Sequence, residues 1–483
     1  MLDSSEAGGR IVRGGALRFG TYVLMVALSV LSAALLTRHL GVVRFGQYTT
    51  VISLVGVVAA ITDAGMSAIG TREFAVRTGA ERDALMRDLL GLRMTLTSVG
   101  VLLVTAFAVA AGYGTALLLG AVLASLSTIA LVVQHTHTIP LAASLRLGTL
   151  SALELARQAA TVGAIVLLVV LGAGVLPLLA VALAVNLLLI PPTAALARHQ
   201  ISLRMGLRPR HWTALLRLTV SFSLASAVGT LYMFTAQILT SLVSGAYQSG
   251  LFAASFRIFI VVTVVPGLLV SGALPLLARA ARDDRERLGY VVRRIFEVSL
   301  ILGVAAAVGT LGGAQFMIHV VAGAKYAAAA KVLQLQGIAL IATFALAGWS
   351  YALLSLRRYT GVLLANLAAF LVSCSLTLVL ANGHGAIGAA IATLCGESVL
   401  ALGLLAAILR GHPELRPPAG IVLKVALAAA PTVVLALLSG VPSLVRAVLA
   451  LAVYGLLIVL MRAVPVEVLE LLPAGVRRPT GSR

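Results

Sequence analysis

The chain is a succession of apolar stretches, each about as long as a helix that crosses a lipid bilayer. A transmembrane helix needs roughly 20 apolar residues, and reading runs of that length predicts about fourteen spans. They are expected at 17–37, 47–70, 89–111, 115–138, 151–172, 174–196, 214–242, 250–276, 295–313, 333–354, 360–380, 386–408, 421–438 and 443–461. Twelve spans are the alternative, because only short loops divide 151–196 and 421–461. The sequence therefore predicts an all-α polytopic membrane protein.

The composition also indicates that most of the chain lies in lipid. Sixty per cent of the residues are hydrophobic and 11% are charged, whereas a soluble domain is about 45–50% apolar and about 25% charged. The net charge of +20 does not indicate a nucleic-acid partner, since no basic region is long enough to fold as a binding module. Attraction to anionic membrane lipids, worth about 1 kcal/mol per cation, fits the short clusters of arginine better.

Several kinds of chemistry find no support in the sequence. The two cysteines, Cys374 and Cys395, lie inside apolar runs and form no disulfide framework or metal-ligand spacing. No phosphate-binding loop of the G-x-x-x-x-G-K-[ST] type is present. His135 and His137 lie two apart and do not share a helix face. We therefore expect no metal, no bound cofactor and no direct use of ATP.

The basic residues predict an orientation in the membrane. With the N-terminus in the cytoplasm, thirty of the 36 Lys and Arg residues fall in the tails and loops of the cytoplasmic side, as the positive-inside rule demands. The first apolar run is followed by "TRHLG" rather than a cleavage site, which favours a retained helix over a signal peptide. We expect a multi-pass protein of the cytoplasmic membrane with both termini in the cytoplasm.

An internal repeat divides the predicted spans. "GVVRFGQYTTVISLV" begins at Gly41 and "GAYQSGLFAASFRIF" begins at Gly245, so that Gly46 corresponds to Gly250. Paired repeats are common in transporters, with the substrate site at their interface. We predict two six-helix bundles with pseudo-symmetry, at 1–200 and 201–410, followed by a C-terminal helix pair and cytoplasmic tail at 411–483.

A family resemblance rests on the stretch "RHLGVVRFGQYTTVISLVGVVAAITDAGMSAIGTREFAV". Its motif residues are Gly41, Phe45, Gly46, Tyr48, Asp63, Gly65, Arg72, Glu73 and Ala75. In this order they resemble the start of the polysaccharide (O-antigen, Wzx-type) flippases of the MOP exporter superfamily. The segments "SGAYQSGLFAASFRI" and "VVAGAKYAAAAKVLQLQGIAL" resemble later parts of the same family, and the likeness weakens after about residue 410.

The resemblance implies a protein that makes and breaks no covalent bond. In the family, two bundles rock about a cavity that passes an oligosaccharide, linked to undecaprenyl pyrophosphate, from the cytoplasmic to the outer leaflet. Other polysaccharide-assembly proteins are the partners that this role implies. The resemblance implies coupling to a proton or sodium gradient for some relatives, and the residues leave open whether this chain is coupled and to which ion.

Three arginines are candidates for the wall of such a cavity. Arg257 lies within a predicted span, where a cation facing lipid costs several kcal/mol, and a guanidinium binds phosphate oxygens well. The alternative is that its side chain reaches the outer headgroups. Arg18, at the cytoplasmic mouth of the first span, and Arg217, at the equivalent place in the repeat, are candidates for headgroup capture, with simple anchoring as the alternative.

Four carboxylates lie in or near spans. Glu397 is the deepest of them. Because an isolated buried carboxylate can bind a proton near neutral pH, Glu397 is the first candidate for coupling transport to an ion gradient. The alternative is that Glu397 has a basic or hydroxyl partner on a neighbouring helix. Asp63 is the second, and it is also expected to cap a helix or to pair near Arg72 as part of the family motif. Local ion pairs are expected at Glu154 with Arg157 and at Glu297 with Arg293 or Arg294.

Other functions on a related scaffold compete with the flippase. A cation-coupled multidrug exporter or a lipid II exporter differs only in the chemistry of its cavity. A membrane glycosyltransferase or polymerase would need acidic residues in an outer catalytic loop, and the predicted outer loops contain no Asp or Glu.

Overall fold

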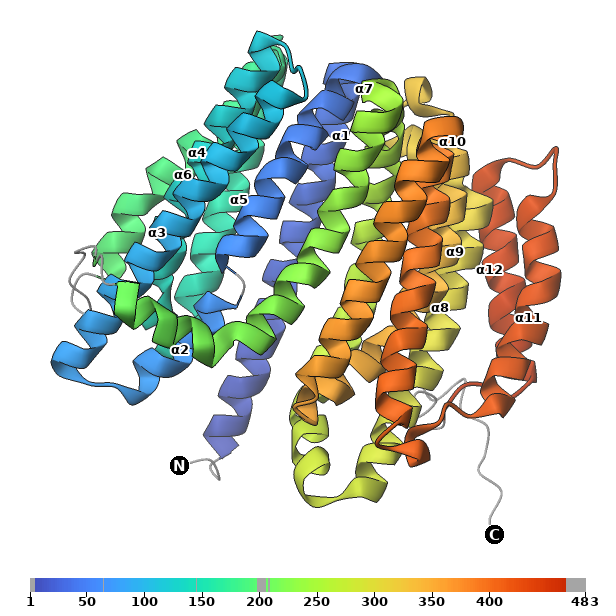
Figure 1. Ribbon diagram of the computed structural model, residues 1–483. Coiled ribbons are helices and arrows are strands. Elements are labelled where there is room, and N and C mark those ends of the chain that lie inside the picture. Colours follow the sequence, from blue (N-terminus) through green and yellow to red (C-terminus); the bar gives the residue numbers. More distant parts are fainter. Residues whose placement is uncertain (1–4, 64, 145, 198–205, 207–208, 466–483) are drawn as a thin grey trace. The chain divides into compact units, whose positions relative to one another are not determined.

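The structure is a computed structural model that describes residues 5–63, 65–144, 146–197, 206 and 209–465. Over these residues the chain forms twelve α-helices and two short 3-10 helices (Figure 1). The α-helices are α1 (Ser5–Asp63), α2 (Met66–Val76), α3 (Gly79–Ala110), α4 (Thr115–Ala143), α5 (Leu147–Val170), α6 (Val175–Ala197), α7 (Pro209–Asp283), α8 (Arg285–Val321), α9 (Ala329–Ser355), α10 (Tyr359–Leu409), α11 (Ala419–Leu437) and α12 (Ser443–Leu460). The 3-10 helices are η1 (Ala324–Tyr326) and η2 (Pro413–Leu415).

Three of these helices are twice as long as a membrane span and are broken by glycine. Gly41 in α1 (φ 71°), Gly245 in α7 (φ 79°) and Gly385 in α10 (φ 56°) adopt backbone angles that are not helical. A positive φ of this size strains any residue with a Cβ. Eleven helices in the described part of the chain are apolar and long enough to span a membrane, which confirms the all-α polytopic fold. Three of these helices divide in two at a glycine, so the arrangement corresponds to the fourteen predicted spans.

The chain forms two compact units. The first contains Met1–Ala253 and Val321–Lys325, and the second contains Ala254–Val320 and Tyr326–Arg483. The first unit therefore includes α1 to α6 and the beginning of α7, and the second includes the end of α7 and nearly all that follows. The boundaries predicted from the sequence, at residues 200 and 410, stay predictions.

In the first unit, α1 turns back on itself at Gly41, and its two halves pack against α3, α4 and α5 (Figure 1). The two copies of the repeat motif meet in this unit. A Cβ added to Gly46 would lie 2.0 Å from the carbonyl oxygen of Ala246, and one added to Gly250 would lie 2.1 Å from that of Val42. The contact is reciprocal, as expected for two related segments. Each position requires glycine, because a Cβ there would overlap the backbone of the other segment.

Buried polar side chains flank this glycine contact. Gln237 donates from Nε2 to Thr49 Oγ1 at 3.1 Å and to Ser249 Oγ at 2.6 Å. Ser249 Oγ is also 3.1 Å from Thr50 Oγ1. All four residues are buried, and buried polar groups are stable when they are hydrogen-bonded to each other. Hydrogen bonds and glycine contacts together hold the beginning of α7 against α1.

In the second unit, close packing again depends on small residues. Along α8 and α9, a Cβ at Gly303 would lie 2.7 Å from Cβ of Phe344, and one at Gly337 would lie 2.0 Å from Oγ1 of Thr310. Helix α12 approaches α8 at Gly312, where an added Cβ would be 3.0 Å from Cα of Ala447. Small residues at contacts are typical of helices that associate in a bilayer, where backbone proximity replaces the hydrophobic effect.

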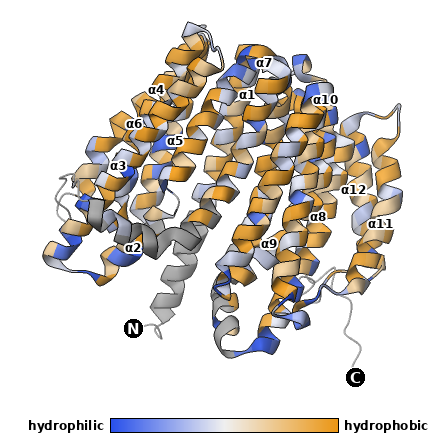
Figure 2. Ribbon diagram, viewed as in Figure 1, coloured by the Kyte–Doolittle hydropathy of each residue, from blue (hydrophilic) through white to orange (hydrophobic). Residues whose placement is uncertain are grey.

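The outer surface of the helices is strongly apolar. Exposed side chains include Leu102 (69% exposed), Val170 (78%) and Val379 (70%). In Figure 2 hydrophobic residues cover long stretches of the helices, and hydrophilic residues gather at helix ends and in connections. Apolar surface of this extent is stable only when it is covered, and for helices of this length lipid provides the cover.

Candidate functional site

A network of polar side chains lies in the first unit, where α1 ends. The helix stops at Asp63, and Gly65, which precedes α2, has a left-handed backbone (φ 77°, ψ 4°). Glycine adopts this conformation without the Cβ clash that penalises other residues. The D-x-G part of the family motif thus ends one helix and starts the next, and it places the Asp63 carboxylate beside α2 and α3.

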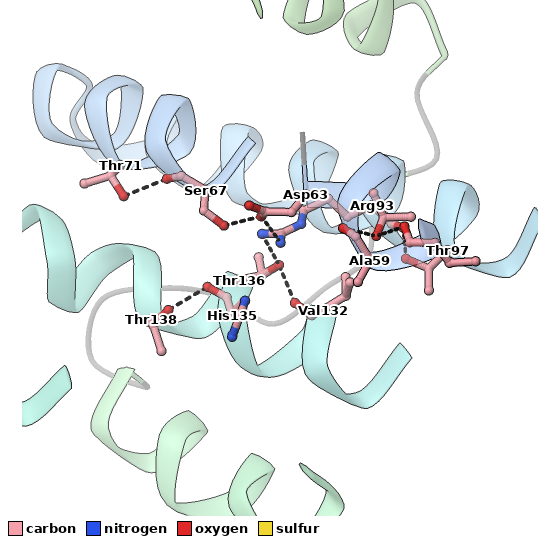
Figure 3. A network of polar contacts seen from close by, with 12 residues as sticks. Ala59, Asp63, Ser67, Thr71, Arg93, Thr97, Val132, His135, Thr136 and Thr138 are labelled. Atoms are coloured by element: carbon pink, nitrogen blue, oxygen red, sulfur yellow. Dashed lines mark hydrogen bonds and ion pairs between the residues drawn. The ribbon is translucent and has the colours of Figure 1, made fainter. Parts of the chain in front are cut away.

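Arg93 of α3 is the centre of the network. Its Nη2 lies 2.6 Å from Oδ1 of Asp63, and the same oxygen accepts a hydrogen bond from the Ser67 hydroxyl of α2 (Figure 3). Nη1 donates to Thr136 Oγ1 of α4 at 3.5 Å, and Thr136 in turn donates to the Val132 carbonyl at 2.8 Å. Four helices, α1 to α4, are connected in this way.

The two partners of the ion pair differ in their access to solvent. The Arg93 side chain is 1% exposed, whereas the Asp63 side chain is 44% exposed. Burying an unpaired cation is very costly, and a carboxylate with hydrogen bonds offsets that cost. Arg93 Nε is also buried and has no partner within the described part of the chain. Asp63 is therefore needed to keep the guanidinium inside the unit.

This arrangement corrects one prediction from the sequence. Asp63 was expected to cap a helix or to pair near Arg72, but Arg72 is exposed on α2, and the ion-pair partner of Asp63 is Arg93. The chain turn at Gly65 carries Arg72 away on the outer face of α2, and α3 returns alongside α1. Glu73 of the same motif pairs with Arg77, one turn further along the chain, at 3.0 Å.

A second ion pair lies near the first. Glu154 and Arg157 of α5 are 2.8 Å apart, with side chains 45% and 33% exposed, which confirms the predicted local pair. His135 of α4 is partly buried and interacts electrostatically with both pairs, that is, with Arg93 and Asp63 and with Glu154 and Arg157. Figure 3 shows it next to Thr136, at the edge of the Arg93 network. Five ionisable side chains from four helices are thus grouped in the first unit.

A separate buried carboxylate lies in the second unit. Glu397 of α10 is 6% exposed, and its Oε2 accepts a hydrogen bond from the Thr343 hydroxyl of α9 at 2.7 Å. The predicted alternative of a hydroxyl partner on a neighbouring helix is therefore what the structure contains. Glu297 pairs with Arg294, three residues earlier, at 2.7 Å, as one of the two expected pairings.

The remaining candidates from the sequence lie elsewhere. Arg257 is partly buried on α7 in the second unit, and its place in a cavity wall stays a prediction. Arg18 and Arg217 belong to α1 and α7, but their side chains lie outside the residues described in detail. Among motif residues, Phe45 (1% exposed) and Tyr48 (9%) are buried, and their rings stack at 6.4 Å.

Sequence reasoning identified Asp63 but missed Arg93, Ser67 and Thr136. Arg93 had been counted with the basic residues of the cytoplasmic side, although the span predicted at 89–111 contains it. A cation several residues inside a span was the available signal, since intramembrane charge usually has a partner. Ser67 and Thr136 gave no signal, because hydroxyl side chains are common in membrane helices and usually bond to their own backbone.

These features define a multi-pass α-helical membrane protein with an internal repeat and a buried polar network in its first unit. The profile of a family described as polysaccharide biosynthesis protein matches residues 35–331, which is more than half of the chain. The chain belongs to this family. The comparison with curated proteins gave no match.

Several solved structures share the fold. The lipid II flippase MurJ in an inward closed conformation aligns with a TM-score of 0.79 and 14% identity, over 94% of this chain and 100% of that one. An inward-facing multidrug resistance MATE family transporter of the MOP superfamily aligns with a TM-score of 0.63 and 14% identity, over 80% and 95% of the two chains. A MOP superfamily transporter from Pyrococcus furiosus aligns at 0.53 and 14%, over 82% and 95%.

Proposed function

We propose that this protein is a flippase that moves a lipid-linked oligosaccharide, a polysaccharide repeat unit on undecaprenyl pyrophosphate, across the cytoplasmic membrane. The observation that carries the proposal is the family match over residues 35–331, on a fold shared over nearly its whole length with a lipid II flippase. The reaction is a translocation between leaflets, without covalent chemistry. Both termini are proposed to lie in the cytoplasm, in line with the distribution of basic residues.

The polar interior of the first unit supports an anionic, amphiphilic cargo. Arg157, whose side chain is 33% exposed, has a buried Nε without a partner among the described residues, and guanidinium groups bind phosphate oxygens through parallel hydrogen bonds. Arg257 remains the proposed contact in the second unit. An apolar exterior and polar groups in the interior suit a molecule whose lipid tail stays in the bilayer while its charged headgroup crosses.

The proposal can be tested with purified protein in liposomes. An undecaprenyl-pyrophosphate-linked oligosaccharide that carries a fluorophore on its sugar is placed in both leaflets, and a membrane-impermeant quencher is added outside. The flippase should make the inner-leaflet fraction accessible, whereas protein-free liposomes should keep it protected. Protection that persists with well-folded protein would overturn the proposal.

A multidrug exporter is the second candidate, because MATE transporters share the fold. The same liposomes, loaded with a cationic dye such as ethidium, distinguish the two functions. Dye export without translocation of the lipid-linked sugar would favour the exporter.

The role of Arg257 has its own control. Arg257→Ala should slow translocation, whereas Arg410→Ala, which removes an exposed arginine of the second unit, should not. An unchanged rate in Arg257→Ala would remove this residue from the site.

A further inference from the structure

Four helices end in the same kind of turn. After α3, α5, α9 and α12, three successive backbone N–H groups donate to carbonyls of the last turns in one repeated pattern, and the middle residue of the three has a positive φ. Glycine is usual at this position, because a residue with a Cβ is strained there. Helices α3 and α5 have Gly112 and Gly172, both at φ 69°, whereas α9 and α12 have Arg357 (φ 55°) and Arg462 (φ 49°).

These two arginines are the only residues other than glycine with a positive φ in the described part of the chain. Both side chains are exposed, and neither guanidinium has a hydrogen bond or an ion pair with another described residue. A helix C-terminus attracts cations, but Arg358, which follows Arg357 at φ −89°, supplies that charge without strain. A strained backbone that the fold itself does not use indicates a function for the side chain.

Both arginines lie at the same end of the second unit. From the end of α9 the chain crosses twice in α10, which turns back at Gly385, and twice more in α11 and α12. The ends of α9 and α12 therefore lie at the same membrane surface. Lys424 of α11 donates from Nζ to the carbonyl oxygen of Arg462 at 3.2 Å, which brings a second cation to the end of α12. In the orientation proposed above this surface is cytoplasmic.

Apolar side chains border these cations. Val459 and Leu460, in the last turn of α12, are 51% and 60% exposed, and Leu423, beside Lys424, is 62% exposed. Leu364, near the start of α10, is 57% exposed. Neither α11 nor α12 contains an acidic residue. This combination fits an amphiphile whose phosphate oxygens accept hydrogen bonds from guanidinium and ammonium groups and whose acyl chains cover the apolar side chains. An acidic protein surface would leave those side chains uncovered.

We propose that the ends of α9 and α12 bind the headgroups of anionic phospholipids, with Arg357 as the phosphate ligand at the first end and Arg462 and Lys424 at the second. We assign the ligands to bulk phospholipids of the leaflet rather than to the lipid-linked cargo, because the two turns end different helices and each is bordered by its own exposed apolar side chains. Bound phosphate compensates the strain of the two turns and anchors the second unit at the membrane surface. The inference does not depend on the proposed function.

Lipid binding is measured by native mass spectrometry of the purified protein in a neutral detergent. Phosphatidylglycerol is titrated against phosphatidylcholine with the same acyl chains, and the wild type should prefer phosphatidylglycerol. Arg357→Gly and Arg462→Gly should each lower this preference about fivefold, the share of one cation near an anionic surface. Arg293→Ala, which removes an exposed arginine from α8, is the matched control and should keep it. No preference in the wild type, or equal losses in all three variants, would overturn the proposal.

Thermal unfolding in nanodiscs separates lipid binding from a structural role of the arginines. In phosphatidylcholine, both glycine variants should melt no lower than the wild type, because glycine relieves the strain. In phosphatidylglycerol, the wild type should gain stability and the double glycine variant should not. Lower melting of the glycine variants in phosphatidylcholine would show that the arginines stabilise the helix ends themselves, which would refute the proposal. Arg357→Asn and Arg462→Asn, which remove the charge and tolerate a positive φ, serve if the glycine variants do not fold.

A competitor distinguishes the two sources of phosphate. Undecaprenyl pyrophosphate, added to the wild type in equal amount, should leave the bound phosphatidylglycerol in place. Displacement in the wild type would assign these sites to the cargo and overturn the proposal. None of these measurements uses transport, so a failure of the proposed function and a failure of this inference are distinguishable.

Discussion

The asymmetry of the Asp63–Arg93 pair gives a prediction about stability. Asp63→Asn leaves a guanidinium that is 1% exposed without its counter-charge. Removing one partner of a buried pair costs about 3–5 kcal/mol. Because the Asp63 side chain is 44% exposed, water screens part of the interaction. We therefore expect Asp63→Asn to lower the free energy of unfolding by about 3 kcal/mol, the lower end of that range, which reduces the folding equilibrium constant more than about a hundredfold.

The converse change should cost less. Arg93→Met removes the cation and keeps most of the side-chain volume, and the Asp63 carboxylate that remains can be hydrated. We expect a loss of about 1–2 kcal/mol, in the range of a hydrogen-bonded polar group that loses its partner. The double variant Asp63→Asn with Arg93→Met should be more stable than Asp63→Asn alone, since it contains no unpaired buried charge.

The assay is equilibrium unfolding of the purified protein by SDS titration in mixed micelles, followed by tryptophan fluorescence and circular dichroism. Glu154→Gln is the matched control: its pair with Arg157 has a similar length of 2.8 Å but side chains 45% and 33% exposed, so about 0–1 kcal/mol is expected. Equal effects of Asp63→Asn and Glu154→Gln, or a double variant no more stable than Asp63→Asn, would refute the reasoning.

Three further predictions concern packing and buried polar groups. Gly46→Ala should destabilise the protein by about 1–3 kcal/mol, because its Cβ would lie 2.0 Å from a backbone oxygen; Gly163→Ala, which meets no atom within 4 Å, should be neutral or stabilising in the same SDS titration. Gly245→Ala should cost about 1–3 kcal/mol, because φ 79° with ψ 176° is a backbone conformation essentially restricted to glycine; the loss would be seen as a lower melting temperature, and an unchanged value would contradict the strained conformation. Thr343→Val should cost about 1–3 kcal/mol, because Glu397 loses a hydrogen bond of 2.7 Å; Thr343→Ser is the control that restores the hydroxyl, and equal losses in both variants would show that the bond is unimportant.

Much of the fold could be predicted from the sequence because a bilayer leaves few choices. Backbone groups in lipid must be satisfied within a helix, so each apolar run of sufficient length becomes a span. The repeat was visible in the spacing of Gly41, Gly46, Gly245 and Gly250, and two of these positions are the helix breaks in α1 and α7. The local ion pair of Glu154 and Arg157 was also predictable, since residues three apart share a helix face.

The candidate site was only partly predictable. Asp63 was identified as part of a motif, but its partner was assigned to the nearest arginine of that motif rather than to Arg93, thirty residues away. Glu397 was recognised as a deep carboxylate, but no sequence pattern distinguishes Thr343, its hydrogen-bond partner on another helix. In both cases the missing information is which helices are neighbours.

The sequence by itself determined that this chain is a membrane protein of about fourteen helices, where the long helices break, and which charges must find partners. Those properties follow from local chemistry: apolar length, glycine at a positive φ, and the cost of a cation in lipid. Only the tertiary structure decided that Arg93 is buried against Asp63 and that His135 lies among two ion pairs. Contacts between helices depend on packing angles and small-residue interfaces, and many arrangements of the same spans satisfy the same hydropathy.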